Sequence, residues 1–385
     1  MQKQQGLTSL YGSNADYAEE AADVVKDING LPVIDSYFRA LMGDIHKALS
    51  KIASIWENNK EVIAEDYNLI QDRIDSYKNF VADFMTTDRN KNQEECFKNA
   101  GWVEIGKNEV PPKLVVCPID IGDRFYSAID DLKKKGVTVV LTSATITFDK
   151  SFGKFCHELG LPIEQITTQI VESPFNYAKN ACLYLSKTFP DVYSKNFVSD
   201  SLYMIDELIR KATGGIFMLC TSFNNMKLAK EVLEKRYSSS RTILMQTEDT
   251  VPNLINQFKK DGKAILIGTS SFWEGVDVAG NALSLVIIDK LPFKQLGDPI
   301  QIARKNRVEK LEKGNFFNQV QVPEATIALR QGVGRLIRNE DDQGVLVILD
   351  NRLLTKGYGP KCVNSLPPMT RVDSVKKALP FFKKV

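Results

Sequence analysis

Apolar residues recur at helical spacing over the first part of the chain. Between Asn14 and about Phe84, three apolar stripes repeat every three to four residues, and Gly30 and Pro32 end the first stripe. The stripes are Tyr17, Ala21, Val24, Val25 and Ile28; Ile34, Phe38, Leu41, Ile45, Leu49, Ile52 and Trp56; and Ile63, Tyr67, Ile70, Ile74, Tyr77, Val81 and Phe84. Each stripe needs a partner surface, so the pattern predicts an antiparallel helical bundle.

The period changes after Pro111-Pro112, which follows a connector or weak strand at 102–105. Leu114–Ile119 and Val137–Leu141 are apolar β-branched runs, and a helix-like segment, Phe125–Lys135, separates them. This succession predicts a β-α-β unit whose parallel strands are buried on both faces.

From about Ala181, strand-like runs alternate with amphipathic segments. Strands are expected at 182–185, 216–221, 242–246, 264–267, 283–288 and 345–349, and helices at 194–211, 224–235, 251–260, 299–313 and 323–338. The alternation predicts an α/β fold with a doubly wound parallel sheet, preceded by the all-helical module. Ligands of such sheets bind outside the carboxyl ends of the strands, where Thr221-Ser222, Thr269-Ser270 and Asp289-Lys290 are expected.

Composition narrows the class only a little. The 385 residues, 43% hydrophobic and 25% charged, suit a globular protein of two or three domains. A net charge of +2 does not by itself predict a polyanion partner. Six cysteines without a C-x-x-C pair predict reduced thiols in a cytoplasmic protein, and two histidines make a metal site unexpected. No apolar run approaches the ~20 residues of a membrane span, so we expect a soluble chain with no membrane partner.

The segment from Gln331 to Arg338 is a candidate anion site. In a helix, Gln331, Arg335 and Arg338 fall along one face, while Leu336 and Ile337 turn toward a core. Two guanidiniums on successive turns can fork onto phosphate oxygens and hold developing negative charge. A solvated basic helix edge is the alternative.

Five strings occur in an order that resembles motifs III to VI of superfamily 2 helicases, most closely those of the DinG/XPD-like branch. The strings are Leu141-Thr142-Ser143-Ala144-Thr145, Cys220-Thr221-Ser222-Phe223, residues 265–280, Lys290-Leu291-Pro292-Phe293, and residues 331–338. Each is weak alone, but the joint match is specific and covers roughly residues 112–360. The resemblance implies RecA-like motor domains and the C-terminal portion of an ATP-dependent DNA helicase.

The resemblance also implies a division of the chain. Residues 1–110 would be a helical arch-like insertion and connector, residues 111–178 the closing segment of the first RecA-like domain, and residues 179–385 the second RecA-like domain. The implied partners are single-stranded DNA, which passes under the arch in this family, and an N-terminal motor half in cis or in trans.

The matched motifs assign roles to individual residues. Arg335 and Arg338, with Gln331, would be catalytic, the arginines acting as fingers on the γ-phosphate. The candidate ATP-binding residues are Glu274, Gly275, Asp277 and Gly334. For Asp277, a turn residue before Gly280 is the alternative.

Coupling and nucleic-acid contacts come from the other motifs. Ser143 and Thr145 resemble the motif that couples nucleotide state to DNA grip, although a strand cap would also explain them. The candidate nucleic-acid contacts are Thr221, Ser222, Phe223, Gln246, Thr269, Phe272 and Trp273. Phe272 and Trp273 could stack a base or form a hydrophobic plug. Arg330 and Lys290 are interpreted as surface charges.

Other parts of an ATP-driven motor are missing from the sequence. It contains no G-x-x-x-x-G-K-[ST] string and no Asp-Glu-Ala-His string. We therefore expect this chain alone to be inactive as an ATPase, with ATP and Mg²⁺ bound mainly by the N-terminal half, and with no iron–sulfur cluster in this chain. The alternative function is a non-catalytic single-stranded nucleic-acid-binding or complementing module. A metabolic α/β domain would leave the spacing between the Glu-Gly-Asp loop and the double-arginine segment unexplained.

Overall fold

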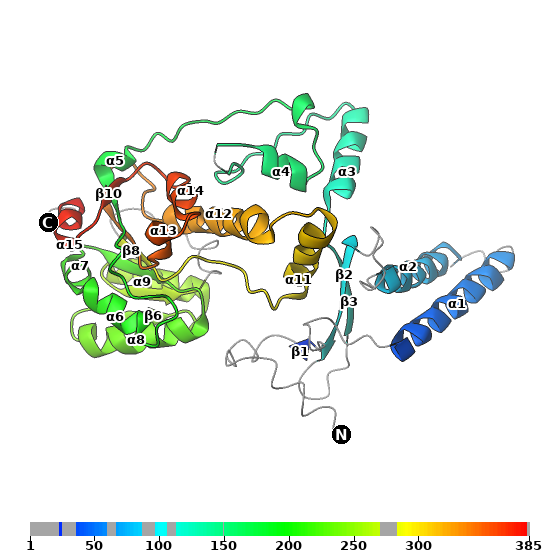
Figure 1. Ribbon diagram of the computed structural model, residues 1–385, viewed down its shortest axis with the longest axis horizontal. Helices are drawn as coiled ribbons and strands as arrows, with labels where there is room; N and C mark the ends of the chain where they lie inside the picture. Colours follow the sequence, from blue (N-terminus) through cyan, green and yellow to red (C-terminus); the bar gives the residue numbers. More distant parts are fainter. Residues whose placement is uncertain are drawn as a thin grey trace, which may run out of the picture. The chain divides into compact units, whose positions relative to one another are not determined.

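A computed structural model describes residues 23–24, 36–59, 67–86, 97–105, 113–148, 150–269 and 283–382 (Figure 1). Internal contacts group the chain into two compact units. The first unit comprises residues 1–136, 158–160 and 295–316, and the second comprises residues 137–157, 161–294 and 317–385.

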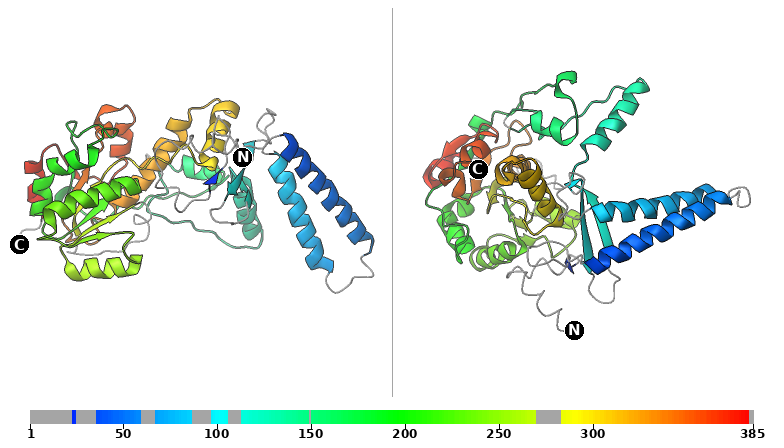
Figure 2. Two further views of the ribbon diagram at one scale, coloured as in Figure 1. Left: turned by 90° about the horizontal axis from the view of Figure 1, so that it is seen from below. Right: turned by 45° about the vertical axis from the view of Figure 1, so that its right-hand side comes forward.

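Two long helices of the first unit, α1 (Ser36–Asn58) and α2 (Tyr67–Thr86), pack side by side (Figure 2). Their buried residues include Met42, Val81 and Phe84. The helices were predicted, but the α1 stripe is only partly correct, because Leu49 packs against this cluster whereas Leu41, Ile45 and Ile52 are exposed. Apolar residues occur on more than one face of α1, and α2 covers only the face that carries Met42.

The first unit also contains an antiparallel three-stranded sheet. It consists of β1 (Asp23–Val24), β2 (Asn99–Ile105) and β3 (Lys113–Pro118), with β2 in the centre. Ala303 of α11 (Pro299–Asn306) packs with Trp102 and Ile119 in a small core. The helix predicted around Val24 is therefore wrong at Asp23–Val24, where the backbone is paired as a strand.

The predicted β-α-β unit is only partly correct. The helix α3 (Gly122–Lys134) follows β3 as expected, but β3 is antiparallel to its neighbour and residues 137–141 form no strand. Val140 is 75% exposed. An apolar run becomes a strand only where a neighbouring strand pairs with it, and no described strand is paired with 137–141.

The second unit is built on a seven-stranded sheet with the order β10-β4-β9-β8-β5-β7-β6, in which all six neighbouring pairs are parallel. The strands are β4 (Ala181–Tyr184), β5 (Gly215–Leu219), β6 (Ile243–Met245), β7 (Ile265–Gly268), β8 (Leu283–Ile288), β9 (Gly344–Ile348) and β10 (Thr370–Val372). The sheet confirms the predicted α/β RecA-like fold, although β10 was not predicted.

Helices cover both faces of this sheet, because strand side chains alternate between two buried cores. Phe217 and Leu219 of β5 face one core, and Ile216 and Met218 face the other. The first face is covered by α9 (Val251–Asp261), α12 (Val322–Val333), α13 (Arg352–Thr355) and α14 (Gly359–Asn364), and the second by α6 (Phe197–Met204), α7 (Asp206–Lys211), α8 (Phe223–Tyr237) and α15 (Val375–Ala378). Two short helices, α4 (Gly153–Glu158) and α5 (Tyr177–Asn180), precede β4. The single helix predicted at 194–211 is broken at Ile205, between α6 and α7.

Candidate nucleotide and nucleic-acid site

The double-arginine segment begins where α12 ends. The helix stops at Val333 rather than at Arg338, so the prediction that Gln331, Arg335 and Arg338 share one helix face is wrong. Gln331 occupies the last turn, and both arginines lie in the chain that follows. Gly332 and Gly334 explain the early end, because each glycine disfavours helix by about 1 kcal/mol relative to alanine.

The segment after α12 is nevertheless firmly anchored. Leu336 and Ile337 are buried, as predicted, and Arg335 and Arg338 on either side are half-buried. The backbone N–H groups of Arg338 and Asn339 donate to Oδ2 of the buried Asp342, at 2.9 and 2.8 Å. The protein therefore holds the two arginines on a fixed loop.

The acidic loop of the predicted ATP site lies outside the described residues. This applies to Glu274, Gly275 and Asp277, and also to Phe272 and Trp273. Their convergence with Arg335 and Arg338 on one cleft therefore stays a prediction.

Arg330 is not the surface charge that we expected. It lies on the last turn of α12, is half-buried, and donates from Nη1 to the Thr147 carbonyl at 2.5 Å and from Nη2 to the Ala144 carbonyl at 3.0 Å. Burial lowers the pKa of Arg330. In the same segment, the hydroxyls of Ser143 and Thr145 lie 3.3 Å apart, and the Thr145 N–H donates to Ser143 Oγ. Hydrogen bonds thus join α12, which leads into the double-arginine segment, to the segment that carries Ser143 and Thr145.

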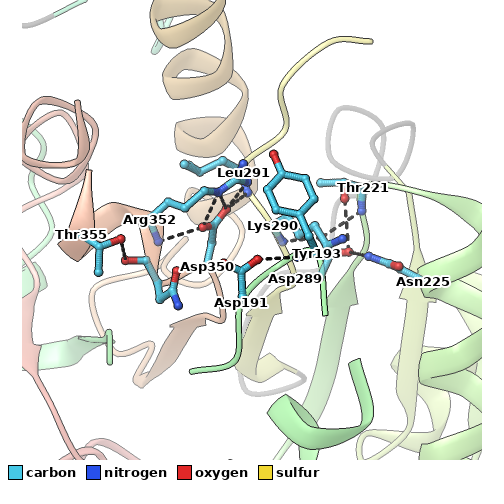
Figure 3. Close-up of polar contacts among 11 residues, drawn as sticks. Asp191, Tyr193, Thr221, Asn225, Asp289, Lys290, Leu291, Asp350, Arg352 and Thr355 are labelled. Atoms are coloured by element: carbon cyan, nitrogen blue, oxygen red, sulfur yellow. Dashed lines mark hydrogen bonds and ion pairs between the residues drawn. The ribbon is translucent and has the colours of Figure 1, made fainter. Parts of the chain in front are cut away.

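At the carboxyl edge of the sheet, a fully buried carboxylate joins two strand ends (Figure 3). Asp289 follows β8 and accepts from the N–H groups of Thr221 and Lys290, at 2.9 and 2.5 Å, and from Asn225 Nδ2 at 2.6 Å. The Thr221 hydroxyl donates to it at 3.3 Å. Burial raises the pKa of Asp289 to about 6, against the opposing effect of these donors. Thr221 is a candidate phosphate contact, but its backbone N–H and its hydroxyl both donate to Asp289.

The other candidate contacts from motifs IV and V also lie at strand ends. Ser222 caps α8, with its Oγ accepting from the Asn225 N–H at 3.1 Å, and Phe223 is the first helical residue. A capped helix N-terminus directs backbone N–H groups at an anion. Thr269 follows β7, and its N–H and hydroxyl donate to Gln246 Oε1 at 2.7 and 2.9 Å. Gln246 therefore positions Thr269.

A second buried carboxylate, Asp350, follows β9. It accepts from the Leu291 N–H at 2.8 Å and from Arg352 Nε and Nη2 at 2.8 and 2.6 Å (Figure 3). Burial opposes the charge on Arg352, but the Asp350 carboxylate outweighs it and raises the pKa of the guanidinium. The guanidinium carbon lies 5.4 Å from the Phe293 ring centroid. We did not single out this pair from the sequence, although an acid directly after an apolar run was the available signal.

Lys290 is also not a free surface charge. It is half-buried, with Nζ 4.9 Å from the Phe197 ring centroid, and burial lowers its pKa.

No group of three or more His, Cys, Asp or Glu side chains within the described ranges is arranged to hold a metal ion. Of the helices in the same ranges, none is both long and apolar enough to cross a bilayer.

Comparisons with known proteins identify the domain that carries this edge. The family profile of the helicase C-terminal domain matches residues 205–369. The chain is 40% identical to the ATP-dependent DNA helicase YoaA of Haemophilus influenzae over 273 residues, which is 70% of this chain and 41% of the relative. It is 40% identical to YoaA of Escherichia coli, with the same coverage, and 34% identical to the 3'-5' exonuclease DinG of Bacillus subtilis over 70% of this chain and 29% of that protein. The chain therefore spans less than half the length of these curated relatives.

Solved structures support the fold. A structure of an XPD helicase aligns with 96% of this chain and 62% of its own, with a TM-score of 0.50 and 14% identity. An apo XPD structure aligns with 91% of this chain and 65% of its own, also with a TM-score of 0.50. The XPD structures share the fold of this chain, and the profile match and the YoaA and DinG relatives support its assignment as the C-terminal part of a DinG/XPD-like helicase.

Proposed function

We propose that this chain supplies the second motor domain of an ATP-dependent DNA helicase of DinG type, including the arginine side of the ATP cleft and part of the single-stranded DNA track. The observation that carries the proposal is the carboxyl edge of the seven-stranded sheet. Ser222 and Thr269 carry motifs IV and V at this edge, and the segment after α12, which leads into the amino end of β9, carries motif VI in the same domain. Because the YoaA relatives are ATP-dependent DNA helicases, this activity is favoured over a non-catalytic binding module.

In this proposal Arg335 and Arg338 stabilise the charge that develops on the γ-phosphate. Buried Leu336 and Ile337 between them support the role, because a finger acts only from a fixed position. Gln331 and Gly334 would face the same triphosphate. Mg²⁺ would be held mainly by the N-terminal half, so no step of the reaction is assigned to a metal ligand among the described residues.

We further propose that the N-terminal motor half covers residues 137–141 and 170–171. Val140, Leu141 and Val171 are 75%, 42% and 81% exposed, although such runs form buried strands in parallel sheets. Pairing with strands of the other half would bury them. The segment would then complete the first motor domain, and Ser143 and Thr145 would lie beside the arginine motif.

Two assays on the 385-residue chain test the proposal. In a salt titration with a fluorescent single-stranded oligonucleotide, binding should weaken steeply as salt rises, because phosphate contacts release counterions. In a steady-state assay with single-stranded DNA, the chain should hydrolyse ATP only after it is fused to the part of the Escherichia coli relative that it does not match. Robust ATPase from the chain alone, or no binding at low salt, would refute the assignment.

A further inference from the structure

One aromatic side chain at the carboxyl edge has no role in the proposal above. Tyr193 lies in the turn between β4 and α6 and is 84% exposed. Figure 3 draws its ring between Arg352 on one side and Thr221 on the other. Arg352 is bonded to Asp350, which follows β9, so the ring beside Arg352 stands at the carboxyl end of that strand.

The turn that carries Tyr193 is rigid. Asp191 Oδ1 accepts from the Tyr193 N–H at 2.8 Å, and the Asp191 carbonyl accepts from the Ser194 N–H at 2.9 Å. Val192, next to Tyr193, is 3% exposed and belongs to the sheet core. Asn351 Nδ2 donates to the Phe189 carbonyl at 2.9 Å and ties this turn to the start of α13. The exposed ring thus projects from a fixed base.

The Tyr193 ring lies close to the guanidinium of Arg352. The guanidinium carbon of Arg352 lies 5.9 Å from the Tyr193 ring centroid, within the range of a cation–π contact. Arg352 itself is held by Asp350 through Nε and Nη2. With 84% of Tyr193 exposed, most of the ring is free to take a flat partner. A tyrosine held in this way loses little conformational entropy when a base stacks on it.

We propose that Tyr193 is a stacking platform for one base of the single-stranded DNA that crosses the carboxyl edge of the seven-stranded sheet. The inference rests on the proposed function, because it presupposes that the chain binds single-stranded DNA. Stacking tolerates any base, since every base has a π face, and so suits a motor that moves along DNA without reading it. The backbone contacts at Ser222 and Thr269 would set the position of the strand, and Tyr193 would hold one of its bases.

The test compares three variants of the full chain by fluorescence anisotropy with labelled oligothymidine at fixed low salt. Tyr193→Ala should raise Kd about 5- to 150-fold, and Tyr193→Phe should stay within about twofold, since the ring is kept. Tyr203→Ala is the matched control, because Tyr203 is 54% exposed and lies 4.4 Å from the Arg236 guanidinium carbon, but near the far end of α6. It should leave Kd unchanged. Circular dichroism should confirm that all three variants fold.

A second readout separates stacking from a structural effect. An abasic oligonucleotide of the same length should bind wild type more weakly than oligothymidine, and Tyr193→Ala should reduce that difference. The slope of log Kd against log salt should not change, because no phosphate contact is lost. If wild type binds DNA and Tyr193→Ala binds equally well, the platform is refuted while the proposed function stands. If wild type does not bind at all, both are refuted.

Discussion

Replacing Asp289 gives the sharpest stability prediction, because this carboxyl is fully buried and its pKa is raised by burial from 3.8 to about 6. At about 1.4 kcal/mol per pKa unit, that rise corresponds to roughly 3 kcal/mol. The native state binds the proton more tightly than the unfolded chain. The stabilisation from Asp289 is therefore complete below about pH 4 and is lost as pH rises through about 6.

Two variants separate charge from hydrogen bonding. Asp289→Asn keeps the shape: its Oδ1 can accept from the N–H groups of Thr221 and Lys290, and its Nδ2 faces Asn225, whose amide can turn to accept. It should remove the pH dependence and gain up to about 3 kcal/mol relative to wild type between pH 4 and 7. Asp289→Ala leaves two buried backbone donors without an acceptor and should cost about 1 to 3 kcal/mol for each.

Urea unfolding of the chain from pH 4 to 8, followed by circular dichroism, measures these differences. Asp373→Asn is a suitable control, because Asp373 is exposed and its pKa is lowered by Lys377. The stabilisation that ionised Asp373 contributes should be lost as pH falls, which is opposite to the pH dependence expected for Asp289. Parallel curves for wild type and Asp289→Asn over the whole range would show that the four donors keep Asp289 ionised, and would refute the reasoning.

Two further predictions concern contacts between elements of the second unit. Arg330→Gln removes both bonds to the Ala144 and Thr147 carbonyls, so amide hydrogen exchange over 144–147 should accelerate about tenfold or more, with exchange in β8 unchanged. Equal exchange in the variant would contradict the contact. Gly344→Ala places a Cβ 2.6 Å from the Ser284 carbonyl and should lower the free energy of unfolding by about 1 to 3 kcal/mol. The control Gly357→Ala, with open space around it, should change it by less than about 1 kcal/mol.

Much of the sheet could be predicted because its strands are buried on both faces. In β8, every residue from Leu283 to Ile288 is buried, and five of the six are apolar, so the sequence pattern alone predicts a buried strand there. The strand β10 carried no such signal, since Thr370–Val372 is short, has an exposed arginine at its centre, and among the described strands is paired only with β4.

Where the sequence misled us, the deciding contact came from elsewhere in the chain. Residues 137–141 have the composition of a strand but no described pairing partner, so they stay exposed. A charged residue such as Arg330 at the end of an amphipathic helix is usually solvated. Only the fold brings the Ala144 and Thr147 carbonyls, which are distant in sequence, within hydrogen-bonding distance of its guanidinium. The end of α12 at Val333 could have been predicted, because the motif places Gly332 and Gly334 on either side of that residue.

The most direct test of the central claim measures ATP hydrolysis after replacing the first arginine of the motif. In the fusion with the unmatched part of the Escherichia coli relative, Arg335→Ala should lower kcat about 10³- to 10⁵-fold with single-stranded DNA bound. Arg371→Ala, which removes an exposed guanidinium bonded to Asn364, should leave kcat unchanged. A kcat for Arg335→Ala within about tenfold of the unmodified fusion would contradict the account.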